Sequence, residues 1–133
     1  MALNNMEIKY KTRKLIKPVD LNARGTLFGG QLLKWIDEEA AIFAICQLST
    51  ASHTPHTNSI VTKIISEIDF VNTAKQGDII EIGCGLIGFG TTSITFACEV
   101  RNKNTQQTIV KVDKIVFVVI DKDGKPTPHG MIK

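Results

Sequence analysis

Two adjacent glycines and one aspartate have the residue types and spacing that acyl-bond hydrolysis requires. Gly29 and Gly30 immediately precede a segment of helical periodicity, and Asp37 follows Gly30 by seven residues. Neither glycine has a side chain to cap a helix, so the first backbone N–H groups stay open to an outside acceptor. Seven residues are about two helical turns, so Gly30 and Asp37 share a face. Such a carboxylate activates water, and such an N–H stabilises an oxyanion.

A purely structural interpretation of the same residues stays open at this point. Two glycines also suit an ordinary junction between a loop and a helix. Asp37, Glu38 and Glu39 also suit an acidic helix surface, and for Glu38 and Glu39 this is the preferred interpretation.

The cysteines and histidines do not favour a metal or redox site. Cys46, Cys84 and Cys98 are far apart in sequence and form no C-x-x-C pair, which indicates free, mostly buried thiols. His53 and His56 lack nearby cysteine or acidic ligands, so we expect no metal.

The segment from Gly83 to Gly88 matches the dinucleotide-binding pattern G-x-G-x-x-G. That motif requires a strand before it and a helix after it. A threonine-rich strand pattern follows here, so the glycines indicate a bent strand and a hairpin turn.

The elements that would position these residues follow from periodicity. One long helix is predicted over residues 31–48, with an apolar face that comprises Leu32, Leu33, Ile36, Ala40, Phe43 and Ala44. Strands are predicted over residues 7–17, 60–71, 78–87, 91–102 and 109–121. The short turns between the later strands favour an antiparallel meander, and the single helix must cover one face of the sheet.

Composition limits the class of protein. The chain has 133 residues, which is about one domain, and 43% of them are hydrophobic. The net charge is +3 without a dense basic stripe, so no nucleic-acid partner is expected. No apolar run approaches the roughly 20 residues of a membrane span, and the first residues lack the pattern of a secretory signal. We therefore expect a cytoplasmic protein.

Residues 22–37 carry the most specific motif of the chain. They match N-A-x-G-x-x-x-G-G-x-L-x-x-x-x-D/E at every fixed position. Weaker matches follow in the same order at residues 60–62, 67–70, 77–78, 90–93 and 121–126. Taken together, the motifs make nearly the whole chain resemble the hotdog-fold acyl-CoA thioesterase family, in its cytosolic acyl-CoA thioester hydrolase branch.

The resemblance implies a fold, an activity and an assembly. The fold is α+β, a single hotdog thioesterase domain over residues 1–133 with a curved antiparallel sheet of about five strands around one long central helix. The activity is hydrolysis of acyl-CoA to a free fatty acid and coenzyme A, as part of fatty acid metabolism. No cofactor is implied, because coenzyme A belongs to substrate and product. The assembly is a homo-oligomer built from dimers, commonly a hexamer that is a trimer of dimers.

The resemblance also implies roles for particular residues. Asp37 is the general base, or alternatively the nucleophile, and the Gly30 N–H polarises the thioester carbonyl. Asn22 positions the water or the thioester across a subunit interface from Asp37. The residues implied to bind substrate or coenzyme A are Phe28, Gly29, Gly90, Thr91, Thr92 and Ser93.

Three residues depart from the family pattern, and other functions stay open. Thr73 stands where the family often has proline, and Asn72 stands where it often has a basic residue. Trp35 replaces a smaller side chain. It either lines an acyl tunnel or packs at a dimer interface, and packing at the interface is the preferred interpretation. The alternatives are a non-catalytic acyl-CoA sensor, a hotdog dehydratase or hydratase, and an RNA-binding sheet domain. The absence of histidine from residues 1–52 weighs against the dehydratase.

Overall fold

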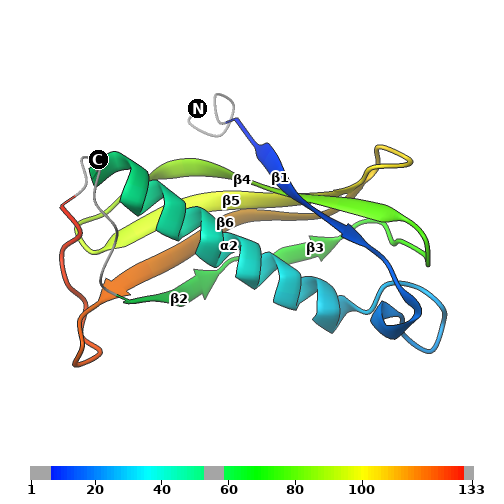
Figure 1. Ribbon diagram of the computed structural model, residues 1–133, viewed down its shortest axis with the longest axis horizontal. Helices are drawn as coiled ribbons and strands as arrows, with labels where there is room; N and C mark the ends of the chain where they lie inside the picture. Colours follow the sequence, from blue (N-terminus) through cyan, green and yellow to red (C-terminus); the bar gives the residue numbers. More distant parts are fainter. Residues whose placement is uncertain (1–6, 53–58, 131–133) are drawn as a thin grey trace.

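One long helix lies against a strongly curved antiparallel sheet (Figure 1). The computed structural model describes residues 7–52 and 59–130. Its elements in chain order are β1 (Lys9–Leu15), a 3-10 helix η1 (Pro18–Asp20), α2 (Gly29–Ser52), β2 (Ser59–Ile65), β3 (Ile68–Phe70), β4 (Ile79–Phe89), β5 (Ser93–Asn102) and β6 (Thr108–Ile120). The predicted helix and curved antiparallel sheet are confirmed.

The sheet has six strands rather than about five. Its order is β1-β4-β5-β6-β2, and β3 also pairs with β6. The strand predicted over residues 60–71 is divided into β2 and β3, because the regular backbone hydrogen bonding to β6 is interrupted at Ser66. The Ser66 hydroxyl accepts a hydrogen bond from the backbone N–H of Lys114 at 3.1 Å, and the Ser66 N–H donates to the Lys114 carbonyl at 2.9 Å. Both β2 and β3 therefore pair with β6, and β3 continues the register that the second half of β2 adopts after a shift between Thr62 and Ile64.

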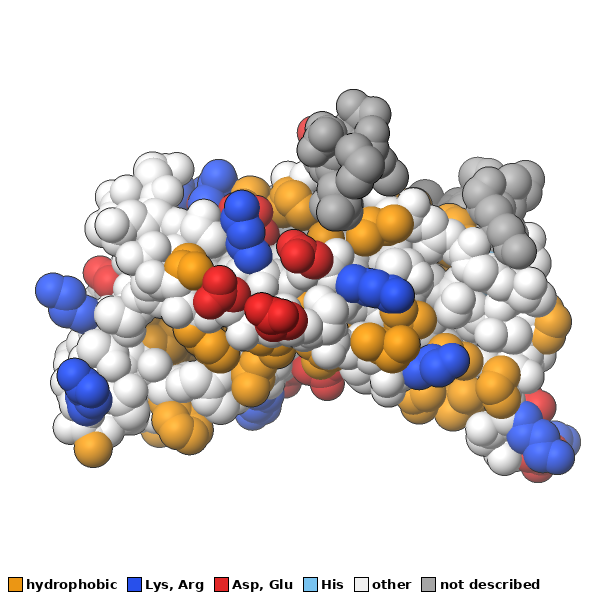
Figure 2. Space-filling view, turned by 180° about the vertical axis from the view of Figure 1, so that it is seen from behind, with side chains coloured by type: hydrophobic (Ala, Val, Ile, Leu, Met, Phe, Trp, Pro, Cys, Tyr) orange, Lys and Arg blue, Asp and Glu red, His pale blue; other side chains and the backbone are white. Residues whose placement is uncertain are grey.

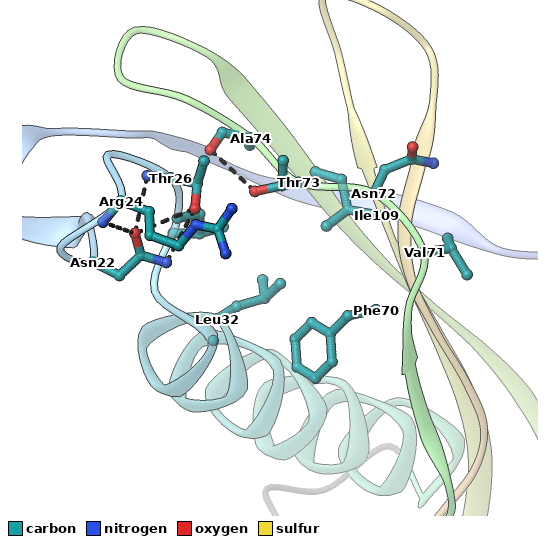
Figure 3. Close-up of a pocket in the computed structure, with 12 residues that line it drawn as sticks. Asn22, Arg24, Thr26, Leu32, Phe70, Val71, Asn72, Thr73, Ala74 and Ile109 are labelled. Carbon is teal, nitrogen blue, oxygen red and sulfur yellow. Dashed lines mark hydrogen bonds between the residues drawn. The ribbon is translucent and has the colours of Figure 1, made fainter.

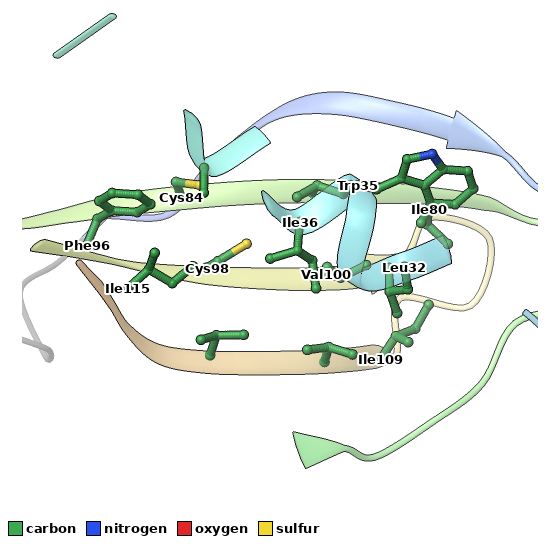
Figure 4. Close-up of a cluster of buried hydrophobic side chains, with 14 of the residues drawn as sticks. Leu32, Trp35, Ile36, Ile80, Cys84, Phe96, Cys98, Val100, Ile109 and Ile115 are labelled. Atoms are coloured by element: carbon green, nitrogen blue, oxygen red, sulfur yellow. The ribbon is translucent and has the colours of Figure 1, made fainter. Parts of the chain in front are cut away.

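The core lies between α2 and the concave face of the sheet (Figure 4). One face of β5 is buried, since Ile94, Phe96, Cys98 and Val100 are each at most 2% exposed. Leu33 was assigned to the apolar face of the helix, but it is 37% exposed at the border of that face. Burial of this surface is the main contribution to stability.

Trp35 packs mainly within its own subunit. It belongs to the central core cluster and is 7% exposed. The Lys14 ammonium lies 5.8 Å from the centre of its ring. Trp35 therefore helps to hold α2 against β1, and its place at a dimer interface stays a prediction.

The glycines of the G-x-G-x-x-G pattern lie in β4, and a hairpin and β5 follow instead of a helix. A Cβ at Gly83 would come within 2.9 Å of the Lys9 carbonyl, so this glycine permits the close approach of β1. The register of β4 against β5 shifts between Leu86 and Gly88, as expected for a bent strand. The strand continues to Phe89, two residues beyond its predicted end at residue 87.

Neither a membrane-spanning helix nor a metal cluster occurs among the described residues. No described helix combines the length and apolarity needed to cross a bilayer. Within residues 7–52 and 59–130, no three histidine, cysteine or acidic side chains lie close enough to hold a metal ion. His53 and His56 lie outside the described residues.

Candidate active site

A buried carboxylate fixes the loop that leads into α2. Asp20 is 1% exposed and accepts hydrogen bonds from the Lys17 backbone N–H at 2.9 Å and the Gln31 amide at 2.8 Å. Burial raises the pKa of Asp20, but these hydrogen bonds and the Lys17 ammonium together lower that pKa below its ordinary value. The Asp20 carbonyl also accepts a hydrogen bond from the Phe28 N–H. Asp20 therefore holds both ends of the loop, and sequence reasoning missed it.

Asn22 organises the turn within this loop. Its side-chain oxygen accepts hydrogen bonds from the N–H groups of Arg24 at 2.9 Å and Thr26 at 3.1 Å. The Gly25 N–H donates to the Asn22 carbonyl at 3.0 Å, and Gly25 has a φ of +82°, which favours glycine. In a single subunit, the Asn22 side chain therefore stabilises its own loop.

The N-terminus of α2 presents open backbone donors. The Phe28 carbonyl accepts the first helical hydrogen bond, from the Leu32 N–H at 3.1 Å. No described residue accepts a hydrogen bond from the N–H groups of Gly29 or Gly30. A Cβ at Gly30 would lie 2.6 Å from the Phe28 ring, which is itself 54% exposed. Glycine thus leaves the helix end accessible beside an exposed aromatic ring.

Asp37 is an exposed carboxylate about two turns along the same helix. Its Oδ1 accepts a hydrogen bond of 2.8 Å from the hydroxyl of Thr62 on β2. This contact fixes one carboxylate oxygen and leaves the other open. Sequence reasoning placed Thr62 in a matching strand but missed this contact, because the pairing joins residues distant in the sequence.

A pocket of about 670 Å³ lies beside the helix N-terminus (Figure 3). Its walls come from the turn after η1, the start of α2, the end of β3 and the start of β6. The residues that line it are Asn22, Arg24, Thr26, Leu27, Gly29, Leu32, Phe70, Val71, Asn72, Thr73, Ala74 and Ile109. The pocket has an apolar floor and a polar rim, as small-molecule sites usually do.

The two residues that depart from the family pattern after β3 form part of this pocket. Asn72 donates a hydrogen bond from its side chain to the Thr108 carbonyl at 2.6 Å, and its N–H donates to the Ile109 carbonyl at 3.4 Å. Thr73 follows it on the pocket wall. These bonds tie the end of β3 to β6, so Asn72 shapes the wall of the pocket.

Residues 90–93 lie far from the helix N-terminus in one subunit. They form the turn between β4 and β5, at the opposite end of the sheet (Figure 1). Gly90 and Ser93 line a second pocket of about 640 Å³. The structure therefore brings Asn22 and Gly29 to one pocket, places Gly30 and Asp37 on the neighbouring helix face, and leaves Gly90, Thr91, Thr92 and Ser93 apart from both.

Charges of both signs are interspersed on the face of the molecule that Figure 2 displays. On the sheet, the buried Glu81 carboxylate binds Arg13 and Arg101, each at 2.9 Å. Burial raises the pKa of Glu81, but the two guanidinium groups together lower it below its ordinary value.

Comparison with known proteins gives a consistent family. The acyl-CoA thioester hydrolase YciA of Salmonella typhimurium is 30% identical over 122 residues, which cover 87% of this chain and 86% of that protein. The acyl-CoA hydrolase of Staphylococcus aureus, solved with butyryl coenzyme A, coenzyme A and coenzyme A disulfide, superposes with a TM-score of 0.72 at 30% identity. That alignment covers 91% of this chain and 68% of the other. The hexameric thioesterase y2039 of Yersinia pestis superposes with a TM-score of 0.71 at 26% identity, over 90% of this chain and 93% of the other.

Further structures of the Staphylococcus aureus enzyme carry alanine in place of an aspartate, an asparagine or a threonine. Residues 24–109 match the family model of the thioesterase superfamily, which is more than half of the chain. The chain therefore belongs to the thioesterase superfamily.

Proposed function

We propose that this protein hydrolyses acyl-CoA thioesters to a free fatty acid and coenzyme A. The observation that carries the proposal is that the chain presents both an exposed Asp37 carboxylate and open N–H groups at the start of α2, which a site between two subunits would bring together. The names of the relatives support the substrate class, since YciA is an acyl-CoA thioester hydrolase and the Staphylococcus aureus enzyme was solved with butyryl coenzyme A.

In the proposed mechanism, Asp37 acts as the general base. It removes a proton from water, and the resulting hydroxide attacks the thioester carbonyl carbon. The Gly30 N–H stabilises the negative oxygen of the tetrahedral intermediate, assisted by the positive end of the helix dipole. The carbon–sulfur bond then breaks, and coenzyme A leaves as its thiol after it takes the proton back from Asp37. Thr62 positions the carboxylate, and the reaction requires no cofactor because coenzyme A enters and leaves with the substrate.

The complete site is proposed to lie between two subunits. The Asn22 side chain is occupied within its own loop, and we propose that it faces the Asp37 of a partner across the interface. The edge strands β2 and β3 carry exposed apolar side chains at Val61, Ile64, Ile65 and Phe70, which supports burial against a second copy. The hexameric state of the Yersinia pestis thioesterase supports a trimer of dimers as the final assembly.

Coenzyme A is proposed to contact both ends of the fold. Phe28 and Gly29 lie beside the thioester position at the helix N-terminus. The turn formed by Gly90, Thr91, Thr92 and Ser93 offers hydroxyl and backbone donors to the pantetheine or phosphate groups. The second pocket, which Gly90 and Ser93 line, supports this role.

The first test is thiol release from a panel of acyl-CoAs from acetyl to palmitoyl. We expect wild-type turnover with at least one chain length, and a loss of about 100-fold or more in kcat for Asp37→Asn. Glu38→Gln is the matched control, because it neutralises the adjacent exposed carboxylate. Unchanged turnover in Asp37→Asn would remove this residue from the mechanism. Binding of coenzyme A without any wild-type turnover would instead support the sensor alternative.

A second test addresses the shared site. Inactive Asn22→Ala and Asp37→Ala proteins are unfolded, mixed and refolded together. If the two residues act across an interface, the mixed oligomers contain some sites with neither substitution, and activity returns. Activity that stays at the level of the separate variants would place both residues of each site in one subunit.

A further inference from the structure

Arg24 is the one charged side chain among the residues that line the pocket beside α2. Its guanidinium projects from the turn into the space between Leu32 and Thr73 (Figure 3). No described residue forms an ion pair or hydrogen bond with this guanidinium. A cation without a partner thus lies at the rim of a pocket whose floor includes Leu27, Leu32 and Ile109.

The backbone that carries Arg24 is held in place. Residues 22–25 form a turn closed by the hydrogen bond from the Gly25 N–H to the Asn22 carbonyl at 3.0 Å. The Arg24 N–H itself donates to the Asn22 side chain at 2.9 Å. Asparagine at the first position and glycine at the fourth are typical of such turns. The arginine therefore extends from an ordered base, and only its side chain must be fixed when a ligand binds.

The nearby carboxylates do not neutralise Arg24. Asp20 is buried and already bonded to Lys17 and Gln31. Asp69 precedes the pocket residue Phe70 on β3, so its side chain points to the opposite face of the sheet. The positive end of α2 lies next to the same pocket, through Gly29. The charge at the pocket rim is therefore positive, without a compensating acid in the pocket lining.

We propose that Arg24 binds a negatively charged group of the thioester substrate. This inference rests on the proposed function, because it assigns part of the same substrate. Guanidinium binds carboxylate and phosphate oxygens through paired N–H donors, and both groups occur in acyl-CoAs. One source is the set of phosphates of coenzyme A. The other is a second carboxylate on a dicarboxylic acyl group, whose methylene carbons suit the apolar floor.

Four substrates separate the two sources: butyryl-CoA, butyryl-pantetheine, glutaryl-CoA and glutaryl-pantetheine. If Arg24 binds the phosphates, Arg24→Gln lowers kcat/KM roughly tenfold for both CoA thioesters and leaves both pantetheine thioesters unchanged. If it binds the acyl carboxylate, Arg24→Gln lowers kcat/KM for both glutaryl substrates and leaves kcat/KM for both butyryl substrates unchanged. Arg24→Lys retains part of the activity in either case. Lys103→Gln is the control for loss of one exposed positive charge outside the pocket lining.

A calorimetric titration separates this inference from the proposed function. Coenzyme A and glutaryl-pantetheine are titrated into the wild type and Arg24→Gln, which requires no turnover. Thermal unfolding of the same samples checks that the variant is folded. A folded Arg24→Gln protein with wild-type affinity for both ligands and wild-type kinetics would overturn the inference. If Arg24→Gln binds one ligand more weakly than the wild type does, and the wild type shows no turnover, the inference about Arg24 is retained and the proposed hydrolysis is refuted.

Discussion

Replacing Asp20 by asparagine tests whether this buried carboxylate fixes the loop before α2. The two carboxylate oxygens accept hydrogen bonds from different donors, the Lys17 N–H on Oδ2 and the Gln31 amide on Oδ1. The Lys17 ammonium lies 3.4 Å from Oδ2. An asparagine has one oxygen and one NH₂ group, so in either orientation its nitrogen faces one of these donors. Asp20→Asn therefore loses a buried hydrogen bond and leaves a donor unsatisfied.

The expected loss in the free energy of unfolding follows from these contacts. A hydrogen bond to a charged acceptor contributes about 1.5–3 kcal/mol, and an unsatisfied buried donor costs a similar amount. Because the loop relaxes in part, we expect a net loss of about 3 kcal/mol at pH 7. For a chain of this size, that lowers the Tm by about 10 °C. The loop also positions Gly29 and Gly30, so kcat should fall as well.

The pH dependence gives a sharper test of the same contact. The folded-state pKa of Asp20 lies below its ordinary value, so its carboxylate stabilises the fold above pH values near 4. This stability is lost as the pH falls through the folded-state pKa, because the protonated group no longer accepts two charge-assisted hydrogen bonds. The stability difference between wild type and Asp20→Asn should therefore narrow below about pH 4.

Urea unfolding followed by circular dichroism at pH 7 and pH 3 measures that difference. Glu81 also has a lowered pKa, but it titrates alike in both proteins and cancels in the comparison. Asp69→Asn is the control for an exposed carboxylate, and we expect little change. Equal stability of Asp20→Asn and wild type at pH 7, or a difference that stays constant down to pH 3, would refute the reasoning.

Three further predictions test the positioning of the base, the core and the sheet edge. Thr62→Val should lower kcat roughly tenfold by freeing the Asp37 carboxylate, and Thr62→Ser should restore it; equal kcat in both variants would contradict this role. Phe96→Ala, which empties a fully buried site, should lower the free energy of unfolding in urea by about 3–5 kcal/mol, and a loss below 1 kcal/mol would contradict its central packing. Ile65→Lys should shift the oligomer to smaller species in analytical ultracentrifugation and abolish thiol release, whereas an unchanged mass would exclude this edge from the interface.

Local patterns predicted most of the fold. The helix and the strands of the meander follow from apolar periodicity, which repeats over many residues. The helix nevertheless begins at Gly29, two residues before the prediction, because the Phe28 carbonyl accepts the first helical bond. Glycine has poor helix propensity, so its own sequence does not indicate that start. The break at Ser66 depends on its hydrogen bonds to Lys114, a partner that sequence periodicity does not reveal.

The candidate site was predicted less completely, for a different reason. Spacing along one helix correctly indicates that Gly30 and Asp37 share a face, because that relation is local. The Thr62 hydroxyl reaches Asp37 only after β2 folds back beside α2. In the sequence, Asp20 looks like an ordinary loop residue. Its role depends on its burial and on the hydrogen bond that it accepts from the Gln31 amide. Contacts between distant segments of the chain thus decide which polar residues support the site.

The separation of the site residues itself argues for association. In one subunit, the turn at residues 90–93 lies at the opposite end of the sheet from Gly30 (Figure 1). A two-fold axis across the edge strand β2 would set a partner's sheet antiparallel to this one. That operation places opposite ends of the two subunits side by side, so the turn at residues 90–93 of one copy approaches the helix N-terminus of the other. A parallel arrangement of subunits would leave these segments apart. The proposed coenzyme A contacts at both ends are therefore those that the proposed isologous dimer would bring together.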